Sequence, residues 1–243
     1  MMHKVAKSLA DTVMFLSLSL RLQLGRRFWL VPALALLWPL YHAVTVLAGW
    51  RELPFDPAKV QNGLIGIPLT VLAIGLGVRV VAAEIEQRTL EVAYTVPGGA
   101  SRVWIGKLSA VALPLLGAGL LLAIPAAVFS PRYSLSSIYG AFQGAAFYLV
   151  LAAGLGAFLR NEITAALVAS VVLGLNGFLT GFGNVPSRWS PLFNPLVVVK
   201  NVSETEMLAW TVQNRIGFAL LILALVMLMC ARAERREKLL SMG

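Results

Sequence analysis

The stretch "YSLSSIYGAFQGAAFYLVLAAGLGAFL", residues 133–159, runs for 27 residues without a charged side chain. About 20 consecutive apolar residues suffice for a helix to cross the hydrocarbon core of a membrane. The run therefore predicts a transmembrane helix. The whole chain has the same character, since 58% of its 243 residues are hydrophobic and 13% are charged, against about 25% charged residues in a soluble domain. A soluble fold is excluded because the polar surface that it needs is missing.

Five further charge-free runs share this property. They cover residues 28–50, 60–78, 108–131, 163–187 and 216–231. We therefore expect an all-α membrane protein that forms one domain over residues 1–243, with six spans at about 28–50, 61–83, 108–130, 135–159, 163–184 and 213–232. The last run is short, and Arg215 and Arg232 are expected to reach the headgroups from its two ends. The first run is too long for the apolar core of a cleaved signal peptide.

The basic residues are distributed unevenly between the two sides of such a bundle. Six spans place both termini on one side, which holds 14 of the 20 lysines and arginines, while the other side holds 6. The positive-inside rule then predicts that both termini are cytoplasmic. Trp29, Trp50 and Trp104 fall at predicted span ends, where tryptophan is typical of the membrane interface. Nucleic-acid binding is not expected, because the basic residues lie in short flanks beside the lipid bilayer and form no folded basic face.

Two regions outside the spans predict further helices. Apolar residues at spacings of three and four over residues 4–24 favour an interfacial helix along the inner membrane surface, with a plain basic tail as the alternative. The outer segment 185–212 is expected to hold short helices before the last span. Ser203, with Glu206 three residues later, matches the capping box that starts a helix.

Two GxxxG patterns lie within the predicted spans, at Gly140–Gly144 and Gly177–Gly181. This spacing lets helix backbones approach closely. The close contact is expected either inside one chain or between two copies.

The predicted spans contain few ionisable groups. None of the 11 acidic residues falls within a charge-free run, whereas ion-coupled carriers need acidic or histidine side chains inside the membrane. Arg79, near the inner end of the second span, is interpreted as an anchor to headgroups. His42 is interpreted as a hydrogen-bonded packing residue. If the chain moves a solute, we therefore expect the energy source in another chain.

Enzyme motifs are missing from the sequence. The single cysteine, Cys230, rules out an intrachain disulfide and a multi-cysteine metal site. Gly106-Lys107 lacks the rest of a phosphate-binding loop, since Ser101 stands where its first glycine is required and Leu108 where serine or threonine is required. We expect no enzymatic activity, no metal and no cofactor in this chain.

The charged segment "EIEQRTLEVAYTVPGGASRVWIGK", residues 84–107, separates two apolar runs. The second helix can continue into the cytoplasm until Pro97-Gly98-Gly99 stops it. Residues 100–107 can form a short helix that leads into the third span. The composition leaves two interpretations, a docking surface for a partner or a loop whose charges only fix the topology.

This segment resembles the first cytoplasmic loop of ABC-2-type transporter permeases. The positions that match the family pattern are Glu86, Thr89, Leu90, Glu91, Pro97, Ser101, Arg102, Gly106 and Lys107. Arg88 departs from the pattern, which has glycine there, and Ser101-Arg102 lie two positions later than is common. The six-span layout, the leading surface helix and the long last outer segment extend the resemblance over nearly the whole chain.

The resemblance implies a permease of a prokaryotic inner membrane that pairs with a second permease, identical or related. It also implies two cytoplasmic ABC ATPase subunits, which carry the ATP and Mg²⁺. Residues 100–107 would be the coupling helix that sits in a groove of the ATPase. The residues expected to contact the ATPase are Glu86, Thr89, Glu91, Pro97, Ser101, Arg102, Gly106, Lys107, Arg160 and Glu162.

The expected function is export of an apolar or amphipathic substrate, such as a lipid, peptide or drug, because the spans hold no buried charge. A sugar polymer and a maturation factor for a metalloenzyme stay open as substrates. The candidate residues of the substrate pathway are Phe142, Tyr148, Asn176 and Phe178. Two other functions stay open: a stand-alone secondary transporter, and a membrane protein that recruits cytoplasmic factors without transport.

Overall fold

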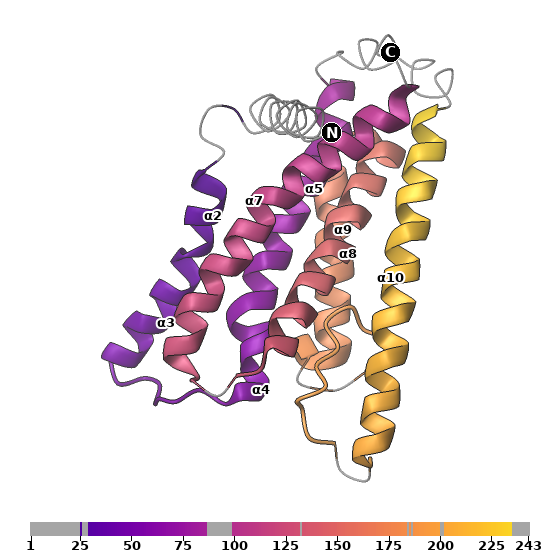
Figure 1. Cartoon of the computed structure of the whole chain (residues 1–243). Coiled ribbons are helices and arrows are strands. Elements are labelled where there is room, and N and C mark those ends of the chain that lie inside the picture. Colours follow the sequence, from indigo (N-terminus) through magenta and orange to yellow (C-terminus); the bar gives the residue numbers. More distant parts are fainter. Residues whose placement is uncertain are drawn as a thin grey trace, which may run out of the picture.

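The computed structural model describes residues 25, 29–86, 99–131, 133–183, 185, 187–199 and 202–234, and the structural statements below refer to these residues. Within them the chain is helical and has no β-strand. The elements are α2 (Leu30–Ala35), α3 (Leu37–Leu47), α4 (Pro57–Lys59), the π-helix η1 (Val60–Gly66), α5 (Ile67–Glu86), α7 (Gly99–Phe129), α8 (Leu135–Leu159), α9 (Glu162–Thr180), the 3₁₀ turn η2 (Gly181–Gly183) and α10 (Glu204–Glu234). The long helices lie side by side in one bundle (Figure 1). The predicted interfacial helix over residues 4–24 lies outside the described residues.

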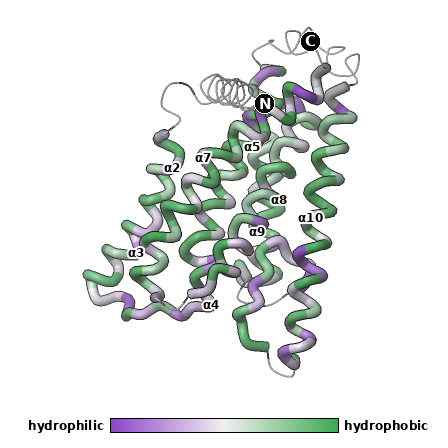
Figure 2. Tube along the Cα trace, in the orientation of Figure 1, coloured by the Kyte–Doolittle hydropathy of each residue, from purple (hydrophilic) through white to green (hydrophobic). Residues whose placement is uncertain are grey.

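Six helical segments are long and apolar enough to cross a membrane, which confirms the predicted number of spans. They cover Leu30–Leu47, Pro57–Ile85, Ser101–Phe129, Leu135–Leu159, Glu162–Thr180 and Glu204–Arg232. Hydrophobic residues follow the length of these helices, and hydrophilic residues gather mostly toward the helix ends (Figure 2). The chain is thus an all-helical integral membrane protein.

The first span consists of two helices, because proline interrupts its backbone hydrogen bonds. Pro39 has no N–H to donate, and its ring clashes with the carbonyl of the residue four positions earlier. That residue is Ala35, where α2 ends. The backbone continues through Leu36, whose N–H bonds to the carbonyl of Ala33 at 3.1 Å in a tighter turn. Both pieces pack against α7 at one margin of the bundle.

The last helix is longer than the sequence predicted. α10 begins at Glu204, well before the predicted span, and no separate short helix over 185–212 is observed in the described part of that segment. Ser203 caps the start, since its Oγ accepts a hydrogen bond from the N–H of Glu206 at 3.2 Å, which confirms the predicted helix start. The charge-free run is shorter than α10 because Arg215 ends the run, whereas arginine is a good helix former and does not end the helix.

The third span also extends beyond its charge-free run. α7 runs without a break from Gly99 to Phe129, so residues 100–107 are its first turns and form no separate short helix. A helix of 31 residues is about 46 Å long. Because no break separates residues 100–107 from the span, a displacement of this end is carried into the span, at least as far as Pro114, the first proline inside the helix.

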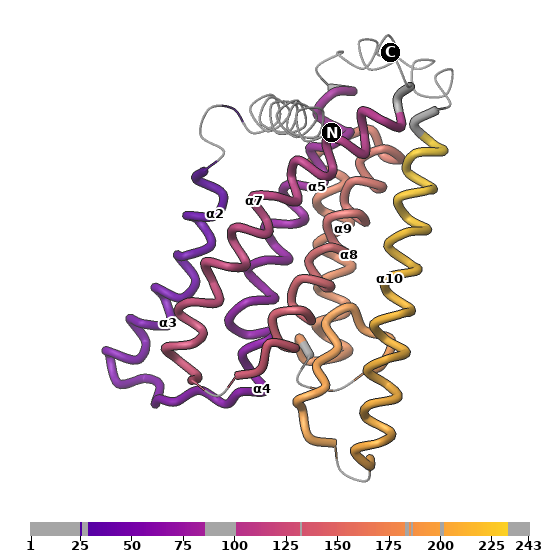
Figure 3. The backbone as a smooth tube through the Cα atoms, in the orientation of Figure 1, coloured from indigo at the N-terminus to yellow at the C-terminus, as the bar shows by residue number. Residues whose placement is uncertain are grey.

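α5 and α8 pack along each other at the centre of the bundle. Figure 3 shows them between α2 at one margin and α10 at the other. Glycines bring the two backbones together: a Cβ on Gly77 would lie 2.4 Å from the carbonyl oxygen of Leu149, and a Cβ on Gly156 would lie 3.1 Å from that of Val78. Small residues allow this approach in membrane bundles.

The two GxxxG patterns make contacts inside the chain. In α8, a Cβ on Gly144 would lie 3.0 Å from the carbonyl oxygen of Pro191. In α9, Gly177 leaves room for the ring of Phe182, which a Cβ would meet at 2.4 Å. Gly181 ends α9 in the left-handed conformation, with φ 53°, which glycine adopts without steric cost. The structure thus uses both patterns for packing within one chain, one of the two expected alternatives.

We predict that Gly77→Ala destabilises the protein, because the new Cβ has no room beside the backbone of α8. Overpacking of this kind costs about 1–3 kcal/mol. The matched control is Gly75→Ala on the same helix, since a Cβ there meets nothing within 4 Å and alanine has the better helix propensity. Thermal unfolding in detergent, followed by circular dichroism, measures both variants. Equal melting temperatures would contradict the close contact of α5 with α8.

Candidate functional site

The two ends of the bundle differ in chemistry. At one end, which we call the Glu86 end, α5 ends, α7 begins, α8 turns into α9, and α10 ends (Figure 1). The opposite end, which we call the Ser190 end, carries the connections 48–56, 130–134 and 181–203. The charged segment 84–107 belongs to the Glu86 end.

The residues expected to contact an ATPase lie at the Glu86 end wherever they are described. They are Ser101, Arg102, Gly106 and Lys107 on the first turns of α7, Arg160 and Glu162 at the turn from α8 to α9, and Glu86 as the last residue of α5. Thr89, Glu91 and Pro97 lie outside the described residues. The side chain of Arg102 is exposed, so it is available to a partner.

An ion pair joins α7 to α5 at this end. Nζ of Lys107 contacts Oε1 of Glu84, and both side chains are largely buried. The same Nζ lies 5.8 Å from the centroid of the Trp104 ring. Trp104 is fully buried, so its ring packs inside the bundle, and its predicted depth at the membrane interface stays a prediction. Because a buried charge that loses its partner is strongly destabilising, this pair fixes the start of α7 against the end of α5.

A second ion pair joins α5 to α9. Nε of Arg79 lies 3.4 Å from Oε1 of Glu162, with both side chains partly exposed. The sequence predicted a headgroup anchor for Arg79, and the structure instead gives it a partner within the chain. The turn beside it is short, since Arg160 ends α8 in the left-handed conformation with φ 58° and Asn161 Oδ1 accepts a hydrogen bond from the N–H of Thr164 at 2.7 Å. α5 is therefore tied to both α7 and α9 at the Glu86 end.

At the Ser190 end, the connection from α9 to α10 folds into the bundle. Ser190, Leu192, Phe193 and Asn194 are all at most 2% exposed. Nδ2 of Asn214 on α10 donates to the carbonyl oxygens of Arg188 and Ser190, both at 2.9 Å.

The same connection is held by α9. Oγ of Ser190 donates to Oδ1 of Asn176 at 2.9 Å. Asn176, a candidate of the substrate pathway, thus binds a connecting segment and not an open space. Together with Asn214, it fixes the connection between the two helices that it joins.

The π-helix η1 binds this connection from the opposite side. Nε2 of Gln61 donates to the carbonyl oxygen of Phe193 at 2.7 Å, and Nδ2 of Asn62 donates to that of Leu192 at 2.9 Å. In return, Nδ2 of Asn194 donates to the carbonyl oxygen of Ala58. Irregular backbone inside a membrane protein needs partners of this kind, and π-helical segments are frequent at functional sites. Gln61 and Asn62 were not among the predicted site residues, although two adjacent amides at the start of an apolar run are a detectable signal.

Arg215 lies inside α10, which begins at Glu204, and its predicted reach to the lipid headgroups stays a prediction. Its Nη1 donates to Oε1 of Gln143 on α8 at 2.6 Å, and Nε2 of Gln143 donates back to the carbonyl oxygen of Arg215 at 2.9 Å. The guanidinium also lies 5.2 Å from the centroid of the Tyr139 ring. A Cβ on Gly140 would lie 2.7 Å from Nη2 of Arg215 and 2.5 Å from Oε1 of Gln61. Arg215 and Gln61 therefore meet over the bare backbone of Gly140.

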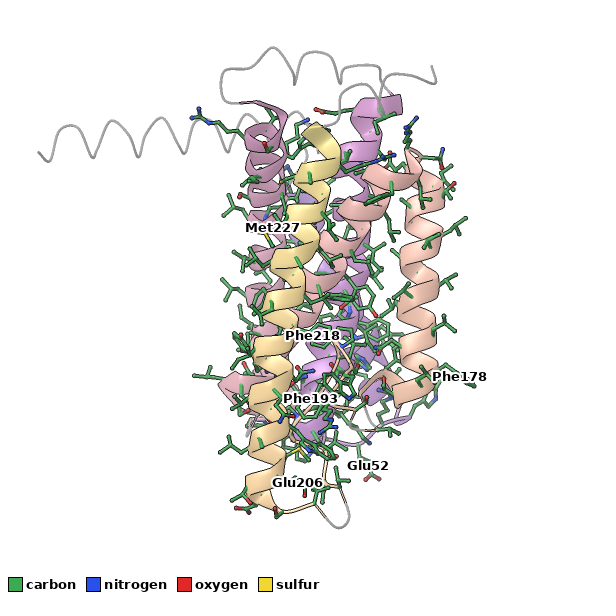
Figure 4. The ribbon with its side chains drawn as sticks, turned by 90° about the vertical axis from the view of Figure 1, so that its right-hand side faces the viewer. Glu52, Phe178, Phe193, Glu206, Phe218 and Met227 are labelled. Atoms are coloured by element: carbon green, nitrogen blue, oxygen red, sulfur yellow. The ribbon has the colours of Figure 1, made fainter. Side chains whose placement is uncertain are left out.

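The structure does not bring the four candidate residues of the substrate pathway together. Phe142 packs against the main hydrophobic core, and a Cβ on Gly119 would meet its ring at 2.3 Å. Tyr148 is fully buried in the second core, with its ring in an edge contact at 5.1 Å with Phe147. Phe178 is 87% exposed and points away from the bundle (Figure 4). Their role in transport stays a prediction.

A pocket of about 540 Å³ lies at the Ser190 end between α3, η1 and Phe182. Its charged lining residues are Arg51, Glu52, Asp56 and Lys59. Nδ1 of His42 lies 3.0 Å from Nη1 of Arg51, and it accepts the hydrogen bond because arginine can only donate. This bond, with an edge contact to the Trp38 ring at 5.2 Å, confirms His42 as a hydrogen-bonded packing residue.

The chain matches no protein-family model, no curated protein and no solved structure. Among the described residues, no group of three histidine, cysteine, aspartate or glutamate side chains is placed to hold a metal ion. The function is therefore inferred from the residues of the chain and their arrangement.

We expect Asn214→Leu to release the connection from α9 to α10. Leucine has the same branching and number of side-chain heavy atoms as asparagine, but it leaves the carbonyl oxygens of Arg188 and Ser190 without their donor. The cost is about 1–3 kcal/mol for a buried unpaired group. Hydrogen–deuterium exchange of peptides over residues 187–199 should accelerate about tenfold or more.

The matched control is Gln213→Leu, because Gln213 is the exposed neighbour on the same helix. Unchanged exchange in Asn214→Leu, or equal acceleration in both variants, would show that Asn214 does not hold this segment.

Proposed function

We propose that the chain is the membrane-spanning permease subunit of an ATP-driven ABC-2-type exporter. The Glu86 end faces the cytoplasm, where a separate ATPase binds the segment 84–107. A second permease, identical or related, completes the pathway across a prokaryotic inner membrane. The residue matches within 84–107 are the sequence basis of this proposal.

The observation that supports it most is the junction of α5 with α7. The segment that would bind the ATPase begins beside Glu84 and ends at Lys107, and these two residues form an ion pair. A force that the ATPase applies to this segment therefore displaces α5 and α7 together. Since α7 is continuous from Gly99 into the span, the displacement reaches the first half of the span directly, as far as Pro114.

The placement of carboxylates supports an external energy source. The described acidic residues lie in connections or near helix ends: Glu52, Asp56, Glu84, Glu86, Glu162, Glu204, Glu206 and Glu234. None of these lies near the middle of a span, where proton- or sodium-coupled carriers place such groups. This favours the ATPase partner over a stand-alone secondary transporter.

The turn from α8 to α9 provides a second contact in the proposal. Arg160 and Glu162 lie at the same end as Arg102, and the ion pair of Glu162 with Arg79 connects them to α5. Both contacts of the ATPase thus converge on α5. Because both contacts are linked to the same helix, movement of the ATPase would displace α5, α7 and α9 together.

We expect Arg102→Glu to weaken binding of the ATPase, because it reverses the charge of an exposed side chain without entering the core. The tagged chain is purified from its native membrane, and the co-purified ATPase is identified by mass spectrometry and by ATP turnover. Glu91→Lys is the second variant, from the part of the segment identified in the sequence. Both variants should lose most of the bound ATPase while the chain still inserts.

The matched control is Lys59→Glu, which reverses an exposed charge at the Ser190 end and should retain the ATPase. Normal co-purification and turnover in both test variants would overturn the proposed coupling. Transport that persists without any ATPase would favour a secondary transporter. A bound ATPase whose turnover ignores every added solute would favour a recruitment protein.

A further inference from the structure

Arg215 is a half-buried cation at the contact of α10 with α8, and it has no carboxylate partner among the described residues. Among the described residues, no carboxylate oxygen lies within 4.0 Å of its guanidinium. The acidic residues on its own helix nearest to the Ser190 end are Glu204 and Glu206, which are exposed at the helix start. A charge in such surroundings is costly and is usually paired or functional.

The orientation of this guanidinium is fixed while most of its donors stay unused. The reciprocal hydrogen bonds with Gln143, at 2.6 and 2.9 Å, hold the side chain against α8. Among the described residues, Gln143 Oε1 is the acceptor to which Arg215 donates a hydrogen bond. A guanidinium carries five N–H donors in a planar fork, which matches the oxygens of a phosphate or carboxylate.

A second cation lies next to the same part of α10. Asn214, the neighbour of Arg215, binds the backbone oxygen of Arg188 at 2.9 Å. The guanidinium of Arg188 lies 5.2 Å from the ring centroid of Trp189 and 6.0 Å from that of Trp210. Arginine and tryptophan side chains together are typical of the headgroup level of a bilayer. Arg188 therefore supplies a second guanidinium beside the part of α10 that precedes Arg215.

An apolar row leads from Arg215 along the outside of α10. Ala219, Leu223 and Met227 follow at steps of four residues, and all three are exposed. Residues at this spacing lie on one face of a helix. Twelve residues of helix rise about 18 Å, which is close to the length of a long acyl chain. Met227 lies on α10 far from the Ser190 end (Figure 4).

We propose that Arg215, held by Gln143 and assisted by Arg188, binds the anionic headgroup of an amphiphile. The headgroup carries a phosphate or carboxylate, and the hydrocarbon tail lies along Ala219, Leu223 and Met227. The amphiphile reaches the site from the bilayer leaflet at the Ser190 end, because Tyr139 and the apolar row are exposed on the outside of the bundle. A free inorganic anion lacks the tail that this row accommodates.

The binding site itself does not depend on the proposed function. Only the identification of the anionic amphiphile as the exported substrate rests on the exporter proposal. An assay of binding in the absence of any ATPase therefore separates the two. Loss of ATPase coupling with intact binding would overturn the exporter and leave the site.

The probe is fluorescently labelled phosphatidylglycerol, and its anisotropy is measured with the purified full chain in neutral detergent. We expect Arg215→Gln to weaken binding about tenfold, which corresponds to the loss of one charge-assisted contact. Arg215→Lys, which keeps the charge but loses the planar fork, should give a smaller loss. The matched control Lys59→Gln removes an exposed cation at the same end and should bind within about twofold of the unchanged chain.

Competition separates the sources of the anion. Unlabelled phosphatidylglycerol should displace the probe, whereas phosphatidylcholine and inorganic phosphate at equal concentration should not. If inorganic phosphate displaces the probe as well as phosphatidylglycerol does, the site binds a simple anion and the proposed amphiphile is wrong. Equal displacement by phosphatidylcholine, or unchanged affinity in a folded Arg215→Gln or Arg215→Lys variant, would overturn the site. Circular dichroism and gel filtration verify that each variant is folded.

Discussion

Backbone groups that leave a helix inside an apolar bundle need hydrogen-bond partners from the chain itself, because no water reaches them. The connection from α9 to α10 meets this constraint through amide side chains. Gln61 and Asn62 on η1 and Asn214 on α10 each donate to carbonyl oxygens of this connection. α10 buries little of its own surface, so these bonds determine where it lies. The arrangement of the last two spans therefore depends on a small set of amides.

The helices are held together by different kinds of interaction at the two ends of the bundle. At the Glu86 end, the contacts of α5 with α7 and α9 are ionic, and ion pairs respond to the charges that a partner brings. At the Ser190 end, the α9–α10 connection is held by hydrogen bonds between neutral amide side chains and backbone, which added charges affect less. η1 and α5 form one continuous span and take part in both sets. A displacement imposed at the Glu86 end thus has a rigid path to the α9–α10 connection.

The number and approximate place of the spans could be predicted because a charge-free run of about 20 residues has few alternatives in a helical membrane protein. The capping residue Ser203 predicted a helix start, but the helix was expected to be short and separate from the last span. The apolar run begins only after Arg215, whereas the backbone hydrogen bonds of α10 continue across this residue. The burial of Trp104 and the ion pairs of Arg79 and Lys107 depend on contacts between spans, which spacing along the chain does not reveal. For the same reason, the sequence could place Asn176 only among the candidate residues of a substrate pathway, and the hydrogen bond from Ser190 could not be predicted.

Under the exporter proposal, the position of Arg215 changes the class of substrate that we expect. The sequence suggested an apolar or amphipathic molecule because no charge was expected inside the spans. With Arg215 inside α10 and bound to Gln143 on α8, the surface that faces lipid carries a fixed cation beside an apolar row. A neutral apolar drug offers no anionic group to the guanidinium of Arg215. An anionic amphiphile can accept hydrogen bonds from the guanidinium with its headgroup and pack its tail against the apolar row. The same geometry accounts for the glycine at position 140, because any side chain there would displace Arg215 from α8.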